Sequence, residues 1–227
     1  MDDRVTRRGS LLRLGGLVAA ALGGAGWRAE AGGAGPAAVA SGAVTCVLAP
    51  EQTEGPYYLD GEKLRGNIRE GKPGVLLTLR ALVVDASTCR PIRGAALDIW
   101  HCDAAGAYSA FGAGAASRTF LRGIQQTDAK GVASFKTIYP GWYPGRTVHI
   151  HVKVHIDGNV VHTGQLFFPD AVTDAVYRRP PYSSRPGRDM RNADDPIFRN
   201  GGSRSLLRLR RKGAAYVATI TMGVQRG

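Results

Sequence analysis

The chain has 227 residues, a net charge of +12 and an apolar content typical of a globular protein. That length allows one domain with a sizeable core, and the body of the chain has no stretch of about 18 uninterrupted apolar residues that would predict a membrane span. Eleven basic residues stand against three acidic ones in residues 178–212, but no zinc-finger spacing, RNA-binding aromatic signature or glycine-rich phosphate loop accompanies them, so the charge suits small anionic substrates and no nucleic acid is expected as a partner.

The N-terminal residues read as a targeting segment. Arg7 and Arg8 precede a stretch rich in Ala, Gly and Leu at residues 11–26, and Ala29-Glu30-Ala31 follows as a small-residue cleavage pattern. This order resembles a twin-arginine-type signal peptide at residues 1–31, so we expect export and processing near Ala31. Retention of the segment as an N-terminal anchor is the alternative.

A Gly/Ala/Ser-rich stretch follows at residues 32–45 and reads as a flexible leader, which leaves residues 46–227 as the folded domain. The domain holds three cysteines, Cys46, Cys89 and Cys102. In an oxidising compartment one disulfide is expected, and the sequence leaves its pairing open. None of the three has a CxxC partner, so the pattern does not favour a thiolate metal site.

Short alternating segments separated by Gly/Pro turns predict an all-β fold. Strands are expected at residues 75–84, 95–100, 133–138, 149–156, 160–168 and 215–224. The Asp157-Gly158 pair between two of these segments predicts a tight hairpin. Helical periodicity is weak outside residues 170–177. We therefore predict a β-sandwich of mixed topology with long loops and little helix.

Two histidines give the strongest functional signal. His149 and His151 alternate with the apolar residues Val148, Ile150 and Val152. Side chains two positions apart leave the same face of a strand, so both imidazoles point one way. Neutral imidazole is a common ligand for transition metals, which makes this pair half of a metal site. The alternative is a strand with two solvated histidines.

Two tyrosines could complete that site. Tyr143 lies in a Pro/Gly-rich loop six residues before His149, and Tyr108 follows a strand end and a glycine turn. Each alone would be an ordinary packing residue. Together with the imidazoles they suit Fe(III), because a phenol with a pKa near 10 needs a strongly acidic metal to lose its proton at neutral pH. Zinc favours three His, or His with carboxylate or Cys, and ferrous oxygenases favour two His and one carboxylate.

Three motifs then carry a family resemblance. They are Trp-x-x-x-Ala-x-Gly-x-Tyr-Ser at residues 100–109, Pro-Gly-x-Tyr at 140–143 and Arg-x-x-His-x-His at 146–151. In this order they resemble the intradiol ring-cleavage dioxygenases of the catechol and protocatechuate type. Thr53-Glu-Gly-Pro-Tyr-Tyr58 is similar to the family's early Gly-Pro-aromatic segment, and the similarity runs from about residue 46 to 224.

The resemblance implies one Fe(III) per chain, bound by Tyr108, Tyr143, His149 and His151. It implies that a catechol binds through both oxygens and displaces Tyr143. It implies further that the ring is cut between the two hydroxylated carbons, that both atoms of O2 are incorporated, and that a muconate-type diacid results. No long helical segment precedes the domain, so the helical dimer of catechol-type members is not assumed, and homo-oligomerisation stays open.

The resemblance also assigns residues around the iron. Arg146 would place a permanent cation beside the developing charge, and Gln165 would orient the substrate. Gly55, Pro56 and Tyr57 would border the substrate pocket. Simpler interpretations are a surface salt bridge for Arg146, a cross-strand or solvated residue for Gln165, and a rigid turn for residues 55–57.

Three other histidines, His101, His155 and His162, match no ligand position, and we expect them at the surface or in a supporting role. Two different interpretations of the whole chain remain alongside the dioxygenase. One is a non-catalytic, transthyretin-like β-sandwich binding module with incidental histidines. The other is a metalloenzyme that uses another metal, such as copper, at the histidine pair.

Overall fold

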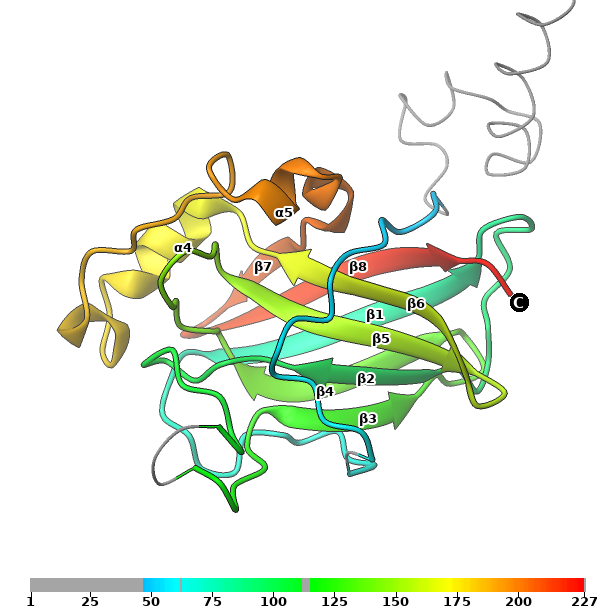
Figure 1. Ribbon diagram of the computed structural model, residues 1–227, viewed down its shortest axis with the longest axis horizontal. Coiled ribbons are helices and arrows are strands. Elements are labelled where there is room, and N and C mark those ends of the chain that lie inside the picture. Colours follow the sequence, from blue (N-terminus) through cyan, green and yellow to red (C-terminus); the bar gives the residue numbers. More distant parts are fainter. Residues whose placement is uncertain (1–46, 62, 112–114, 227) are drawn as a thin grey trace, which may run out of the picture.

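Two four-stranded sheets pack face to face in the computed structural model, which describes residues 47–61, 63–111 and 115–226 (Figure 1). The first sheet has the order β4-β1-β8-β7, formed by Val132–Ile138, Leu76–Asp85, Ala215–Val224 and Arg208–Lys212. The second has the order β3-β2-β5-β6, formed by Arg122–Gln126, Ala96–Trp100, His149–Ile156 and Asn159–Phe167. β1 and β8 run parallel and the other pairs antiparallel, which confirms the predicted β-sandwich of mixed topology.

The six predicted strands all form, each within a residue of its expected ends. The sequence pattern missed β3 and β7, for different reasons. β3 begins at Arg122, which is fully buried, so its residues lack apolar alternation. β7 reads Arg-Leu-Arg-Arg-Lys and lies at the edge of its sheet, where charged side chains protect an unpaired strand from aggregation.

The hydrophobic core lies between the two sheets, and one face of each sheet packs into it. Leu77, Leu79 and Ala81 of β1 are almost fully buried there, as are Ile150 and Val152 of β5. Strand alternation then sends His149 and His151 to the opposite, outer face of the second sheet. In a two-layer sandwich that face would ordinarily meet water.

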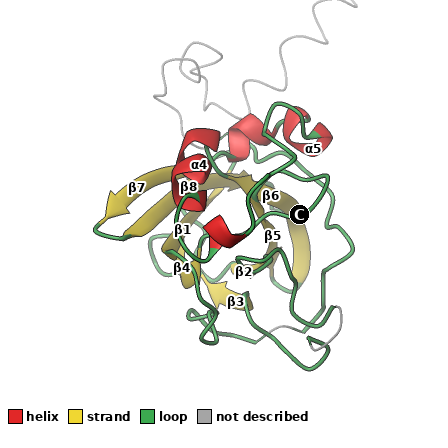
Figure 2. Cartoon of the chain, turned by 90° about the vertical axis from the view of Figure 1, so that its left-hand side faces the viewer, coloured by secondary structure: helices red, strands yellow, loops and turns green. Residues whose placement is uncertain are grey.

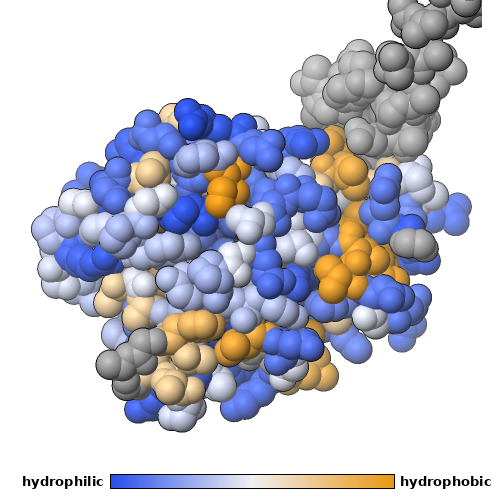
Figure 3. Space-filling view, in the orientation of Figure 1, coloured by the Kyte–Doolittle hydropathy of each residue, from blue (hydrophilic) through white to orange (hydrophobic). Residues whose placement is uncertain are grey.

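Here the outer face is covered by residues 50–61 and 63–66, which we call the crossing segment. Gln52 N donates to Thr163 O on β6 at 2.9 Å, Gln165 Nε2 donates to Thr53 O at 3.0 Å, and Arg65 N donates to Ile124 O on β3 at 2.8 Å. The segment passes in front of the second sheet in Figure 1. The same side of the molecule is largely hydrophilic in Figure 3. The crossing segment therefore converts a solvent-facing sheet surface into an interior.

Helices gather along one side of the sandwich (Figure 2). They are α4, Asp170–Tyr177, which matches the predicted helical turn, and α5, Pro196–Arg199, with two 3₁₀ turns at Tyr182–Ser184 and Gly202–Ser205. In the part of the chain that is described, none is both long and apolar enough to cross a membrane.

Of the cysteines, Cys89 is disulfide-bonded and Cys102 is a buried free thiol. Burial raises the pKa of Cys102 to about 12. Cys46 lies outside the described residues, as do the predicted signal peptide and leader at residues 1–45.

The predicted hairpin is present between β5 and β6. Ile156 pairs with Asn159, and Asp157 and Gly158 both have positive φ, at 50° and 83°. Two successive residues of positive φ define the type I′ turn, whose twist matches that of the flanking strands.

Replacement of Gly158 by Ala tests this turn. The space around it is open, so the cost is that of a left-handed backbone alone, and we expect the free energy of unfolding to fall by about 1 kcal/mol. Urea denaturation measures the loss. Asp157→Asn is the control, because Asn also tolerates this conformation; equal stability of Gly158→Ala and wild type would contradict the turn assignment.

Candidate metal centre

The two histidines of β5 meet at their outer ring nitrogens. His149 Nε2 lies 3.0 Å from His151 Nε2, and both side chains are at most 2% exposed. The hydroxyl of Tyr143 lies 3.0 Å from the same nitrogen of His149. Three of the four predicted ligands therefore converge on one point under the crossing segment.

A hydrogen bond at Nδ1 determines which ring nitrogen of His149 carries the proton. Nδ1 lies 2.7 Å from the carbonyl oxygen of Thr147, which can only accept, so Nδ1 carries the proton. Burial, reinforced by the charge of Arg146, lowers the pKa of His149 to about 3, so the ring is neutral. Its Nε2 then presents a lone pair to the cluster, as a metal ligand requires.

His151 is held by packing. Its ring stacks on Trp100 with centroids 4.9 Å apart and planes 4° apart. On its edge sits Gly55, where an added Cβ would lie 3.2 Å from His151 Cε1. Among the described residues Nδ1 of His151 has no hydrogen-bond partner. Burial, the neighbouring His149 and Arg146 hold the pKa of His151 well below its usual value, so this ring is also neutral.

Two glycines bring the tyrosine loops together. A Cβ on Gly106 would lie 2.2 Å from the carbonyl oxygen of Trp142, and one on Gly141 would lie 2.4 Å from that of Asp103. Only glycine permits backbones to approach this closely. The contact places the loop that carries Tyr143 against the loop that carries Tyr108, with ring centroids 5.7 Å apart. The glycines in both sequence motifs thus have a packing reason.

Tyr108 is the fourth predicted ligand, and its ring packs against that of Tyr57. Its side chain is 4% exposed, its ring stacks on Tyr57 at 4.2 Å, and its centroid lies 6.2 Å from that of His151. The hydroxyl is buried without a well-formed hydrogen bond to any described residue. A buried hydroxyl without a well-formed hydrogen bond is costly, and a cation bound among these side chains would satisfy it.

Burial governs the protonation of both phenols. It raises the pKa of Tyr143 to about 12 and that of Tyr108 well above its ordinary value, although the charge of Arg146 opposes both shifts. Without a metal both phenols therefore keep their protons at neutral pH. Only a strongly acidic cation bound among them would remove those protons.

This donor set of two nitrogens and two oxygens fits a hard trivalent ion such as Fe(III). Within the described ranges no group of three or more His, Cys, Asp and Glu side chains could hold a metal ion. A metal at this cluster would therefore need the tyrosine oxygens.

Arg146 and Gln165 lie side by side at the cluster. Arg146 Nη2 donates to Gln165 Oε1 at 2.5 Å, and Gln165 Nε2 donates to Thr53 O, which ties the pair to the crossing segment. Arg146 also forms an ion pair with Asp195 at 2.9 Å, but this pair is largely buried, whereas the simpler interpretation placed it at the surface. Gln165 is fully buried and does not face solvent.

Of the predicted pocket residues, Gly55 and Tyr57 touch the cluster directly. Gly55 packs on His151, and Tyr57 lies against both tyrosines, with its ring centroid 6.1 Å from that of Tyr143. Pro56 between them is exposed.

Two residues at the site escaped the sequence analysis. Arg122 is fully buried; it donates to Ser109 and, through Nη1, to the carbonyl of Tyr57 at 2.6 Å, so it ties the crossing segment to the Tyr108 loop. Asp195 is likewise unexposed and holds Arg146. Asp195 is followed by Pro196, a helix-start signal that could have marked Asp195. Nothing in the sequence around Arg122 marks that residue.

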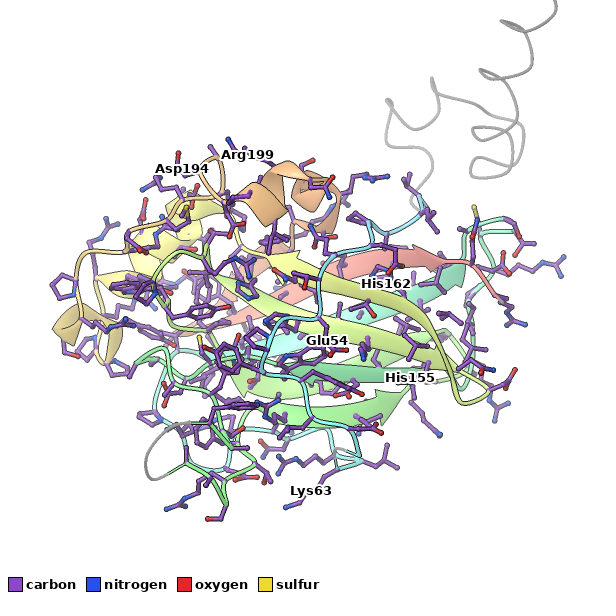
Figure 4. All side chains as sticks on the ribbon, viewed as in Figure 1. Glu54, Lys63, His155, His162, Asp194 and Arg199 are labelled. Carbon is purple, nitrogen blue, oxygen red and sulfur yellow. The ribbon has the colours of Figure 1, made fainter. Side chains whose placement is uncertain are left out.

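The remaining histidines lie outside the cluster. His101 bonds to Cys102 O and Thr137, and His162 to Glu51. Both are buried, so a surface position was wrong for them: His101 is enclosed between the sheets and His162 beneath the crossing segment. His155 is partly exposed beside the hairpin (Figure 4).

The chain resembles known proteins over most of its length. A family model described as "Dioxygenase" matches residues 53–174. The structure of an intradiol ring-cleavage dioxygenase from Tetranychus urticae is 35% identical with a TM-score of 0.76, covering 79% of this chain and 95% of that one. The dioxygenase domain of a carbohydrate-binding fusion protein from Streptomyces sp. SirexAA-E is 33% identical with a TM-score of 0.63, covering 79% and 99%.

Among curated proteins, the chlorocatechol 1,2-dioxygenase of Rhodococcus opacus is 27% identical over 143 residues, which is 55% of each chain. The match thus spans about half the length of that relative. A β-sandwich with a buried tyrosine–histidine cluster is the class that fold and site define. The chain belongs to the intradiol ring-cleavage dioxygenase family.

The buried His101 predicts a pH dependence of stability. Burial lowers its pKa from 6.5 to about 4, so between these values the unfolded chain binds a proton that the folded protein does not. This contribution to stability is complete above pH 6.5 and is lost as the pH falls towards 4, at up to about 1.4 kcal/mol per pH unit.

His101→Gln removes this titration. We expect the free energy of unfolding, measured in urea at pH 5 and 6, to depend less steeply on pH in the variant, by about 1 kcal/mol per unit. Identical slopes in both proteins would show that His101 is protonated when folded.

Proposed function

We propose that the protein is an Fe(III)-dependent intradiol dioxygenase that cleaves a catechol-type ring with O2 to a muconate-type diacid. The observation that carries this proposal is the meeting of Tyr108, Tyr143, His149 and His151 in one desolvated cluster. Family membership and the buried hydroxyl of Tyr108, which has no well-formed hydrogen bond among the described residues, support it.

Fe(III) bound to this set would draw electron density from a chelated catecholate, so that its ring can react directly with O2. The protein's own contribution begins with Tyr143, which is more exposed than Tyr108 or either histidine and so faces the incoming substrate. If Tyr143 is displaced from the iron as tyrosinate, its oxygen would take up a proton that the catechol releases, because away from a metal burial raises the pKa of Tyr143 to about 12. The rings of Tyr57 and Tyr143 are nearly perpendicular, at 84°, and would form an aromatic wall beside the bound substrate.

Arg146 supplies the electrostatic part. Its guanidinium is held by Asp195 at Nε and by Gln165 at Nη2, so it is a fixed cation that need not reorganise when charge develops on the ring. Gln165, anchored to the crossing segment, would orient the substrate. The crossing segment keeps bulk water from the histidines.

We also propose that the protein is exported through its twin-arginine-type segment at residues 1–31. The disulfide of Cys89 supports an oxidising destination. A signal fusion to a reporter, with Arg7 and Arg8 replaced by Lys, measures whether export depends on the arginine pair.

Removal of a ligand should remove both colour and iron. We expect Tyr108→Phe and His151→Ala, after growth with iron, to lose the burgundy charge-transfer absorption of tyrosinate on Fe(III) and to consume O2 with catechols at least 100-fold more slowly. Tyr58→Phe and His155→Ala make the same chemical changes nearby and should keep both.

Retained iron and activity in both ligand variants would contradict the assignment. A colourless wild type that binds catechols without oxygen uptake would favour the binding module, and a copper-loaded active protein would favour the other metal. Oxygen-electrode assays over a panel of plain, carboxylated, hydroxylated and chlorinated catechols, with mass analysis of the products, identify the substrate.

Arg146 can be tested separately from the ligands. Arg146→Ala should keep the iron and its colour but lower kcat by about 10²-fold, because a preorganised charge is lost. Arg146→Lys should restore little of this, since one ammonium cannot replace the fork that bridges Asp195 and Gln165. A fully active Arg146→Ala enzyme would remove the electrostatic role.

A further inference from the structure

Asp195 is a buried carboxylate that accepts hydrogen bonds from two different segments of the chain. It is 0% exposed and precedes α5. Oδ1 accepts from two backbone groups of that helix, Ile197 N at 2.7 Å and Phe198 N at 3.2 Å. Oδ2 accepts from the loop before β5, from Arg146 Nε at 2.9 Å and Thr147 N at 2.8 Å.

The carboxylate of Asp195 stays ionised in the folded protein. Burial alone would raise the pKa of Asp195, but the Thr147 N–H and the guanidinium of Arg146 outweigh it and hold that pKa below the ordinary value. At neutral pH Asp195 is therefore ionised. An ionised acceptor makes hydrogen bonds about twice as strong as a neutral one.

The first consequence concerns Arg146. Its Nε is fixed by Asp195 and its Nη2 by Gln165 Oε1, so two neighbouring donors on one edge of the guanidinium plane are held. Without Asp195, the bond to Gln165 would be the one side-chain hydrogen bond to a described residue left to orient this cation beside the cluster.

The second consequence concerns His149. Asp195 holds the amide N–H of Thr147, and the carbonyl of Thr147 accepts the Nδ1 proton of His149. The hydroxyl of Thr147 is tied in turn to Asn192, 2.7 Å away. One carboxylate therefore fixes the cation directly and an imidazole of the site through Thr147.

We propose that Asp195 is the positioning residue of this active site, which orients the Arg146 guanidinium for the ring-cleavage reaction. The inference rests on the proposed function for its catalytic consequence. The competing interpretation is that Asp195 serves only as the cap of α5, a four-residue helix, and acts on activity through stability alone.

Asp195→Asn tests this with little change of size, because the amide can still accept one set of backbone N–H groups but no longer carries charge. Asp194→Asn makes the same change at an exposed neighbour and is the control (Figure 4). We expect Asp195→Asn to keep its iron and colour and lose 10- to 100-fold in kcat. Asp194→Asn should match wild type.

A double-mutant cycle with Arg146→Ala separates positioning from capping. If Asp195 acts through Arg146, the loss in kcat that Asp195→Asn causes in wild type should largely vanish in the Arg146→Ala background. An equal fold-loss in both backgrounds would overturn the proposal.

The Nε–H resonance of Arg146, read by NMR in the metal-free protein and assigned by its loss in Arg146→Ala, needs no activity. We expect slow exchange with water in wild type and Asp194→Asn, and fast exchange in Asp195→Asn. Unchanged exchange in Asp195→Asn would overturn the positioning of Arg146. A wild type inactive on every catechol would refute the proposed function instead, while this resonance still reports whether Asp195 holds the guanidinium.

Discussion

Desolvation of two imidazoles on the outer face of β5 is the constraint on which the site depends. Strand alternation directs His149 and His151 away from the core, and the crossing segment then encloses them. Burial keeps both rings neutral, which leaves lone pairs for a metal. The same burial keeps the phenols of Tyr108 and Tyr143 protonated until a strongly acidic cation is present. The four side chains thus favour one kind of occupant.

Rigidity around the cluster comes from contacts between segments far apart in the chain. Glycines 106 and 141 let two loops touch, and Trp100 supports the ring of His151. Arg122 joins the Tyr108 loop to the crossing segment, and Asp195 joins α5 to the loop before β5. Each ligand is therefore placed by at least one partner from another element. Such support is what a site needs to hold reacting groups in a fixed geometry.

The sequence predicted what is local or carried by a motif. Alternation located six of the eight strands in the described residues, Asp157-Gly158 located the hairpin, and the spacing of His149 and His151 placed both on one face. The order of three motifs pointed to the tyrosines, which the structure brings to the same place. The missed features are long-range. No pattern near residue 50 shows that this segment covers a sheet, and Asp195 meets Arg146 across 49 positions.

The proposed chemistry requires that Tyr108, Tyr143, His149 and His151 bind a single iron. Anomalous diffraction from iron-loaded crystals tests it most directly. We predict one strong peak per chain within bonding distance of both tyrosine oxygens and of Nε2 of both histidines. A peak that leaves either tyrosine oxygen beyond bonding distance, or that lies elsewhere in the chain, would show that these four side chains do not form the iron site.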